Sequence, residues 1–178
     1  MPPAEPRPGS TRVDPAWLLL LGAALLLLRA GWGVWETYHP ADRSEKVRWV
    51  AFEEAEAVAR ATGKPILYDF SADWCGPCNQ MKADVFADAD LAHALESQVV
   101  PVRVLDRARE DGHNAAWVDS LQRAFSVTGF PTLVVYSPDH RRSRMTSGYG
   151  GKQATMTWVA QNVMAVRVGV TRDGQRLP

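Results

Sequence analysis

The placement of the cysteines is the feature that most limits what this chain can fold into. The chain has only two, and both lie in one four-residue window, from Cys75 to Cys78. The window follows a short, mostly apolar run over residues 65–70, which is typical of a buried strand, and it opens a helical stretch over residues 76–86. Any fold for this chain must therefore contain a strand that leads directly into a helix headed by a dithiol.

The chain beyond residue 44 alternates strands with helices. Strands are predicted over residues 47–51, 65–70, 99–105, 132–136 and 144–147, and helices over residues 52–62, 76–86, 90–96, 114–125 and 152–168. Helical crossovers make the first strands parallel, whereas a terminal hairpin makes the last ones antiparallel. We therefore predict an α/β domain of three layers with a mixed central sheet.

A long apolar segment precedes this domain. Residues 16–35 are apolar or glycine except for Arg29, and twenty residues of helix span about 30 Å, the thickness of the hydrocarbon core of a bilayer. An arginine at the bilayer centre costs about 2.5 to 3.5 kcal/mol, which the eight leucines of the segment outweigh. We predict one N-terminal transmembrane helix over residues 16–35 that attaches the protein to a membrane.

Composition sets the other boundaries. Residues 1–15 hold five prolines and are predicted to be a disordered tail, residues 36–44 a linker, and residues 45–178 the folded domain. A cleaved secretory signal and a buried soluble helix are the alternatives for residues 16–35, although no small-x-small cleavage site follows the segment. The Lys and Arg counts on its two sides leave the orientation open.

Charge and residue spacing exclude several functions. Twenty basic residues balance twenty acidic ones, so the chain lacks the surplus of cations that nucleic-acid binding requires. The four histidines show no metal-ligand spacing, and no glycine-rich dinucleotide fingerprint is present, so we expect neither a metal nor a cofactor. A structural disulfide closing so short a loop would constrain the unfolded chain little, and the dithiol therefore indicates redox chemistry.

The residues of the window suit thiol–disulfide exchange. Free backbone N–H groups and the positive end of the helix dipole favour a thiolate at the first cysteine, so we expect Cys75 to be exposed and partly ionised near neutral pH. Cys78 lies about one helical turn further on and can resolve a mixed disulfide. Gly76 permits close approach of a partner backbone, and Pro77 fits the first helical turn. The neighbouring carboxylate of Asp73 opposes thiolate formation unless it is screened.

Several residues around the window match a known family. Trp74 before the dithiol, Asp69 in the preceding strand, and the Gly-Phe-Pro-Thr sequence of residues 129–132 resemble the thioredoxin superfamily. Residues 63–75 are most similar to the thioredoxin-like domain at the C-terminus of transmembrane thiol:disulfide interchange reductases. The resemblance covers about residues 47–168 and implies a thioredoxin fold.

The resemblance also implies roles for individual residues. Cys75 matches the attacking cysteine, Cys78 the resolving one, and Asp69 the buried carboxylate that exchanges a proton with the resolving cysteine. Pro131 matches the cis-proline that faces the dithiol, and the backbone before it, at Phe130, pairs with an extended substrate.

Trp74, Gly76 and Pro77 complete the substrate-binding residues that the resemblance implies. Trp74 matches the aromatic beside the active site, and simple packing is the alternative for it. For Asp69 the alternative is a strand-end residue that is hydrogen-bonded at the surface.

The chain departs from the family pattern at three places. The lysine that commonly accompanies the buried carboxylate has no clear match, because Val102 falls near that position with Arg103 beside it. Asn79 stands where many thioredoxins have a basic residue. Residues 107–120 are longer than in small thioredoxins, and their charged run over residues 107–111 is either a solvated loop or a partner-docking surface.

Resemblance and anchor together imply a thiol:disulfide oxidoreductase attached to the inner membrane by a single helix, with its catalytic domain in the periplasm. Gly and Pro between the cysteines resemble the reducing members of the superfamily. Protein disulfides are then the substrates, and an upstream dithiol must supply electrons. The alternative from another class is a non-catalytic thioredoxin-like binding module that holds a partner at the membrane.

Overall fold

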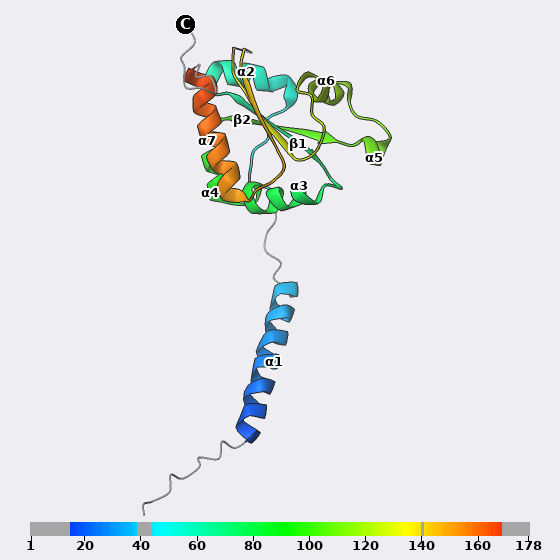
Figure 1. The fold of residues 1–178 in the computed structure, drawn as a ribbon, viewed down its shortest axis with the longest axis vertical. Helices are drawn as coiled ribbons and strands as arrows, with labels where there is room; N and C mark the ends of the chain where they lie inside the picture. Colours follow the sequence, from blue (N-terminus) through cyan, green and yellow to red (C-terminus); the bar gives the residue numbers. More distant parts are fainter. Residues whose placement is uncertain (1–14, 39–43, 140, 169–178) are drawn as a thin grey trace, which may run out of the picture. The chain divides into compact units, whose positions relative to one another are not determined.

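The computed structural model describes residues 15–38, 44–139 and 141–168. The chain divides into two units, Met1–Asp42 and Arg43–Pro178. The first contains helix α1 (Pro15–Tyr38), whose leucines are exposed (Figure 1). In the part of the chain that is described, no helix combines the length and the apolar character needed to cross a membrane.

The predicted tail and linker lie largely outside the described residues. Of the tail over residues 1–15, only Pro15 is described, and it begins α1. Of the linker over residues 36–44, the first three residues continue α1 and residue 44 has no regular secondary structure, so the linker stays a prediction. Residues 39–43 lie outside the description.

The second unit is built on a four-stranded sheet. Its elements are α2 (Phe52–Thr62), β1 (Ile66–Ala72), α3 (Gly76–Met81), the π-helical turn η1 (Lys82–Phe86), α4 (Ala89–Gln98), β2 (Val100–Asp106), α5 (Ala108–Asp111), α6 (Ala116–Ala124), β3 (Thr132–Tyr136), β4 (Ser143–Ser147) and α7 (Lys152–Val168). The strand order is β2-β1-β3-β4. β1 is parallel to β2 and antiparallel to β3, and β4 is antiparallel to β3, so the predicted mixed sheet is confirmed.

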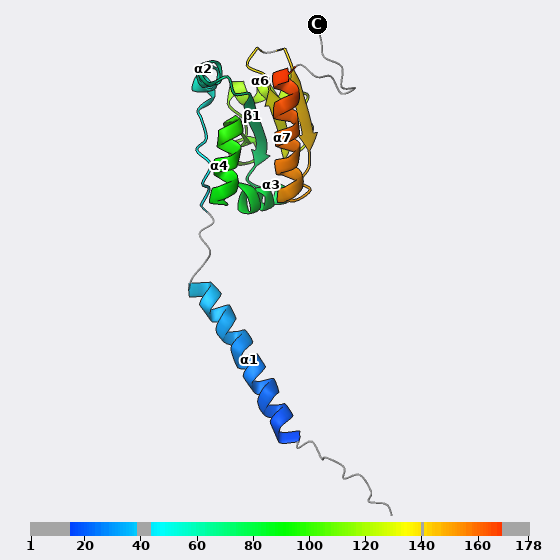
Figure 2. The same cartoon turned by 90° about the vertical axis from the view of Figure 1, so that its left-hand side faces the viewer.

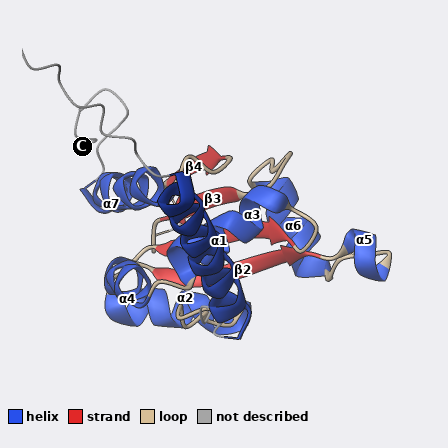
Figure 3. Cartoon of the chain, turned by 90° about the horizontal axis from the view of Figure 1, so that it is seen from below, coloured by secondary structure: helices blue, strands red, loops and turns tan. Residues whose placement is uncertain are grey.

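Two hydrophobic clusters divide the domain into three layers. Because side chains alternate along a strand, Leu67 of β1 packs with residues of α3, η1, α4 and α7, whereas Tyr68 and Phe70 pack with α2 and α6 on the opposite face. Figure 2 looks onto the α4 and α7 side, and Figure 3 shows β2 and β4 at the two edges of the sheet. The three-layer prediction is confirmed, and β1 lies at the centre with every residue buried.

The strand predicted over residues 47–51 does not form. The segment lies beside edge strand β2, where the Val50 N–H donates to the Pro101 carbonyl at 2.8 Å. Proline has no N–H with which to return a hydrogen bond, so no ladder develops from this contact. The alternation of Val47 and Trp49 instead directs these side chains into the cluster with α3, η1, α4 and α7.

The chain between β1 and β2 carries the dithiol helix. α3 continues without a break into η1, where the Ala87 N–H donates to the Lys82 carbonyl at 2.9 Å. Asp88 is the N-cap of α4, and its carboxylate accepts from the N–H groups of Asp90 and Leu91. α3, η1 and α4 thus follow one another between β1 and β2.

Candidate active site

The two cysteines form a disulfide at the head of α3. Cys75 is the N-cap residue, and its Sγ accepts from the Cys78 N–H at 3.2 Å. Pro77 lies in the first turn, where its missing N–H costs nothing. The dithiol helix that the sequence predicts is confirmed, and the spacing of three residues places the second sulfur directly beside the first.

The disulfide is more covered than the sequence led us to expect. Cys75 is 4% exposed and Cys78 5%, and both pack with Ala72 and Phe130. The expectation of an exposed Cys75 is therefore wrong for this disulfide form, because apolar side chains close over the sulfurs. A Cβ added to Gly76 would meet open space, and the approach of a partner backbone there stays a prediction.

The loop between α6 and β3, which contains Phe130 and Pro131, lies against the dithiol. The Phe130–Pro131 peptide bond is cis, as the resemblance implies. The Thr132 hydroxyl donates to the Gly129 carbonyl at 2.8 Å and shapes the loop. Phe130 contacts the cysteines and also meets the ring of Trp74 edge-on at 5.9 Å. The rim of the site is thus aromatic, and Trp74 is 45% exposed there, so its role in substrate binding stays a prediction.

Asp69 lies at the centre of β1 and is completely buried. Its burial is the main reason that its pKa rises to about 6, although the charge of Arg103 opposes the rise. Oδ2 accepts from Nε and Nη2 of Arg103, both at 3.2 Å, whereas Oδ1 is buried without a hydrogen-bond partner. The alternative of a surface residue is wrong, and a buried carboxyl group that can take up a proton stands behind α3.

Arg103, which the sequence placed only beside the position of the missing family lysine, is the residue that binds Asp69. In the parallel register it pairs with Asp69, while Val102 pairs with Tyr68 and points into the cluster with α2 and α6. The side chains of Arg103 and Asp69 therefore lie on the same face of the sheet. Strand alternation could have found it, since the apolar residues at 68 and 70 and at 102 and 104 place residues 69 and 103 on the same opposite face.

Residues 107–111, for which the sequence left a solvated loop or a partner-docking surface, lie largely in solvent but are helical rather than a loop. They contain the short helix α5, and Arg107 Nη1 donates to Asp73 Oδ2 at 3.1 Å. The Arg109 guanidinium lies 4.0 Å from the centre of the Trp74 ring. α5 therefore flanks the dithiol window, and the charge of Asp73 that opposes a thiolate at Cys75 is paired.

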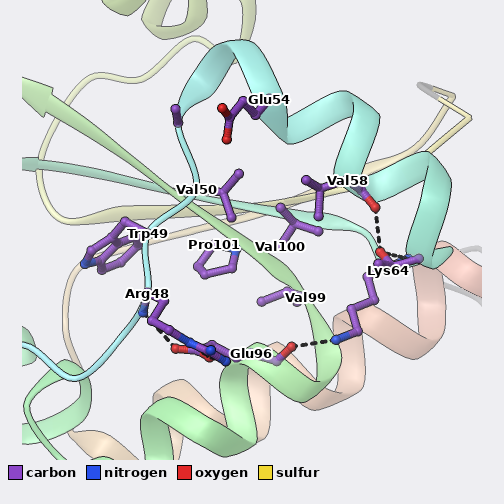
Figure 4. A pocket seen from close by; sticks show the side chains of 12 residues that line it. Arg48, Trp49, Val50, Glu54, Val58, Lys64, Glu96, Val99, Val100 and Pro101 are labelled. Atoms are coloured by element: carbon purple, nitrogen blue, oxygen red, sulfur yellow. Dashed lines mark hydrogen bonds and ion pairs between the residues drawn. The ribbon is translucent and has the colours of Figure 1, made fainter.

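A pocket of about 370 Å³ lies apart from this site, between α2 and the start of β2 (Figure 4). Its floor is apolar, and at its rim Arg48 donates to Glu96 at 2.6 Å and Lys64 donates to the Glu96 carbonyl at 2.8 Å. Neither cysteine lines it. Over residues 15–38, 44–139 and 141–168, no group of three or more His, Cys, Asp or Glu side chains could hold a metal ion.

A mixed sheet with a helix-capping disulfide, a buried carboxyl group behind it and a cis-proline loop beside it defines a class of α/β dithiol proteins. The family model described as a Thioredoxin-like domain matches residues 52–163, so the chain belongs to this family.

Curated relatives with similar sequences include two interchange proteins. The thiol:disulfide interchange protein DsbD of Salmonella typhimurium is 30% identical over 136 residues, which are 72% of this chain and 23% of that protein. DsbD 2 of Pseudomonas aeruginosa is 38% identical over 94 residues, 52% of this chain and 15% of that protein. The chain thus spans at most about a quarter of the length of these relatives.

Solved structures share the fold. A DsbH oxidoreductase superimposes with a TM-score of 0.58 at 21% identity, covering 70% of this chain and 89% of that one. The C-terminal domain of Neisseria meningitidis DsbD in its oxidised form gives a TM-score of 0.50 at 22% identity, with 60% and 89% covered. At these identities the likeness establishes the thioredoxin fold.

Proposed function

We propose that this protein is a thiol:disulfide oxidoreductase that reduces the disulfides of extracytoplasmic proteins. The observation that carries the proposal is the Cys75–Cys78 pair at the head of α3, with the buried Asp69 carboxyl group behind it in β1. The similarity to interchange proteins supports the same reaction. The Gly-Pro pair between the cysteines favours the reducing direction.

The reaction consists of two exchanges. The Cys75 thiolate attacks one sulfur of a substrate disulfide, forms a mixed disulfide with it, and expels the other substrate sulfur as a thiolate. Cys78 gives its proton to Asp69, and its sulfur then attacks the Cys75 sulfur. The bond between Cys75 and the substrate breaks, so the second substrate sulfur leaves as a thiolate. Two electrons have passed to the substrate, and an upstream dithiol restores the pair by the reverse steps.

The substrate reaches the sulfurs along the aromatic rim. Phe130 and Trp74 border the disulfide, and the backbone at Gly76 faces open space. We propose that an extended substrate segment pairs with the backbone before Pro131 and places its disulfide over Cys75. Since Cys75 is nearly covered, the approach selects chains that can lie flat between these two aromatic side chains.

The protein is further proposed to be held at the inner membrane by residues 16–35, with the catalytic domain in the periplasm. This proposal is supported by the eight leucines and the twenty-residue length of the segment. An oxidising compartment would supply the disulfides that the reaction consumes.

The exchange reaction is tested with the reduced full-length chain and a disulfide-bonded peptide substrate. We expect Cys75→Ser to reduce the rate to that of the peptide without protein, because the attacking sulfur is lost. Cys78→Ala should accumulate a mixed disulfide on Cys75, visible by mass spectrometry, since nothing resolves it. Equal rates for Cys75→Ser and the unchanged chain would favour the non-catalytic binding module, and accumulation in Cys75→Ala instead would reverse the two roles.

A further inference from the structure

A second carboxylate shares the guanidinium that binds Asp69. Glu45 lies just before the segment beside β2, and its Oε1 accepts from Arg103 Nη1, while Asp69 Oδ2 accepts from Nε and Nη2 of the same group. Lys82 Nζ lies 2.9 Å from the same Glu45 oxygen, and the Trp49 indole donates to Glu45 Oε2 at 2.6 Å. β2, η1 and the segment before α2 thus meet at one carboxylate.

The Arg103 guanidinium also contacts two aromatic rings. Its guanidinium carbon lies 4.1 Å from the centre of the Trp49 ring and 5.4 Å from that of Phe86. Glu45 and Arg103 are largely covered, and Lys82, which is half exposed, caps the cluster toward solvent. A surface ion pair is worth little, but one that is shielded from water is screened far less.

We propose that Glu45 is a positioning residue for the exchange reaction: it holds Arg103 against Asp69 and divides the guanidinium charge between two carboxylates, so that proton uptake at Asp69 depends on a residue near the start of the domain. The proposal rests on the proposed function, in which Asp69 takes the Cys78 proton. Glu45 acts by holding Arg103 and by its own negative charge, and it is not among the residues that pack with the two sulfurs in the described structure.

The charges that act on Asp69 set the direction of the effect. Arg103 from β2 lowers its pKa, and Glu45 from the segment before α2 raises it. Lys82 from η1 pairs with Glu45, and β3 presents the apolar Leu133 opposite Asp69. Burial alone would raise the pKa of Glu45, but hydrogen bonds from Arg103 and Lys82 outweigh burial and hold it low, so Glu45 stays charged near neutral pH.

Glu45→Gln removes this charge and keeps one amide oxygen, which can accept from Arg103, while the amide nitrogen replaces the oxygen that accepts from Trp49. Arg103 then acts on Asp69 alone, so the titration midpoint of Asp69 should move to lower pH by about one unit. The midpoint is measured by carbon NMR of the Asp69 carboxyl group in the reduced full-length chain. The pH at which mixed disulfides of the same variant are resolved should move in the same direction.

Lys82→Met provides the opposite test at a half-exposed position. Without the positive charge of Lys82, Glu45 interacts more strongly with Arg103, which then stabilises the Asp69 carboxylate less. The titration midpoint of Asp69 should therefore rise. The matched control is Glu96→Gln, which removes a carboxylate bound by two nitrogens of Arg48 outside the cluster and should leave the midpoint unchanged.

Two results would overturn the inference: an Asp69 midpoint that stays unchanged in both Glu45→Gln and Lys82→Met, or one that rises in Glu45→Gln, which would give Glu45 a structural role only. If Glu45→Gln fails to fold, Lys82→Met alone decides. Because the NMR titration needs no turnover, it stays informative when the chain shows no exchange activity, and the two proposals fail separately.

Discussion

At the scale of single residues, the site is organised around one buried acid. Asp69 is ordinary by residue type, yet its place in the fully buried β1 moves its titration into the neutral range. A carboxyl group of this kind can hold a proton at about pH 6 and release it near pH 7, which is what the proposed proton transfer from Cys78 requires. The same burial must cost folding free energy.

We expect Asp69→Asn to be more stable than the unchanged chain at pH 7. Asp69 has a folded pKa of about 6 against an ordinary value of 3.8. Its contribution to stability is therefore full below about pH 4 and is lost as the pH rises through about 6, a loss of at most about 3 kcal/mol.

Urea denaturation of the oxidised chain at several pH values measures this difference in unfolding free energy. The difference in unfolding free energy between Asp69→Asn and the unchanged chain should be smallest near pH 4 and grow to about 1 to 3 kcal/mol at pH 7. Carboxylates outside the cluster of Asp69, Arg103 and Glu45 cancel in the comparison. A difference that does not change with pH would contradict the raised pKa.

At the scale of elements, α5 shows how a short helix can belong to a site without carrying its chemistry. Arg107 joins Asp111 of α5 to Asp73, which lies two residues before Cys75, and Arg109 covers part of Trp74. All of these charged groups lie near solvent, so their effects on folding stability are small. Their charges can nevertheless change how readily the neighbouring Cys75 thiol ionises.

Arg107→Ala should move the midpoint of Cys75 alkylation to higher pH by about 0.3 unit in the reduced full-length chain, because Asp73 is left uncompensated beside the thiol. Asp73→Asn should move it to lower pH. The measurement is the rate of iodoacetamide modification against pH, at low salt. Arg60→Ala, which breaks an exposed ion pair on α2, serves as the control, and a shift of equal size there would contradict the local explanation.

Elements whose signals are local could be predicted from the sequence. The first turn of α2 holds the acidic residues Glu53 and Glu54, and its C-cap is Gly63, whose φ of 67° a residue with a side chain rarely adopts. Both ends of this helix could therefore be predicted from the sequence. The strand over residues 47–51 failed because its fate depends on Pro101, a residue of another element. The same limit applied to Glu45, because nothing in its neighbourhood indicates an arginine 58 residues away.

At the scale of the whole molecule, the dithiol domain was foreseeable and its attachment stays a prediction. The order of strands and helices followed from hydrophobic patterning, and the family resemblance assigned the cysteines, the cis-proline and the buried acid. The charge cluster of Glu45, Arg103 and Lys82 needed coordinates, because it depends on the register of β1 with β2 and on where η1 turns.

The proposed anchor makes a prediction about the full-length chain. After expression in bacteria it should stay in the membrane fraction when alkaline carbonate removes peripheral proteins, whereas a variant lacking residues 16–35 should be released. Protease added to spheroplasts should cleave the catalytic domain if it faces the periplasm. Release of the full-length chain by carbonate would contradict the anchor, and protection from protease would reverse its orientation.

Pro101 also affects how separate copies of the protein behave in concentrated solution. The exposed side of an outer strand can recruit a strand from another molecule, which is a route to aggregation. At this position β2 offers no donor, and its one acceptor is already occupied by Val50. A strand from a second copy therefore cannot form a continuous hydrogen-bonded ladder along that side of β2. Aggregation of the protein by strand addition at this edge is thereby disfavoured.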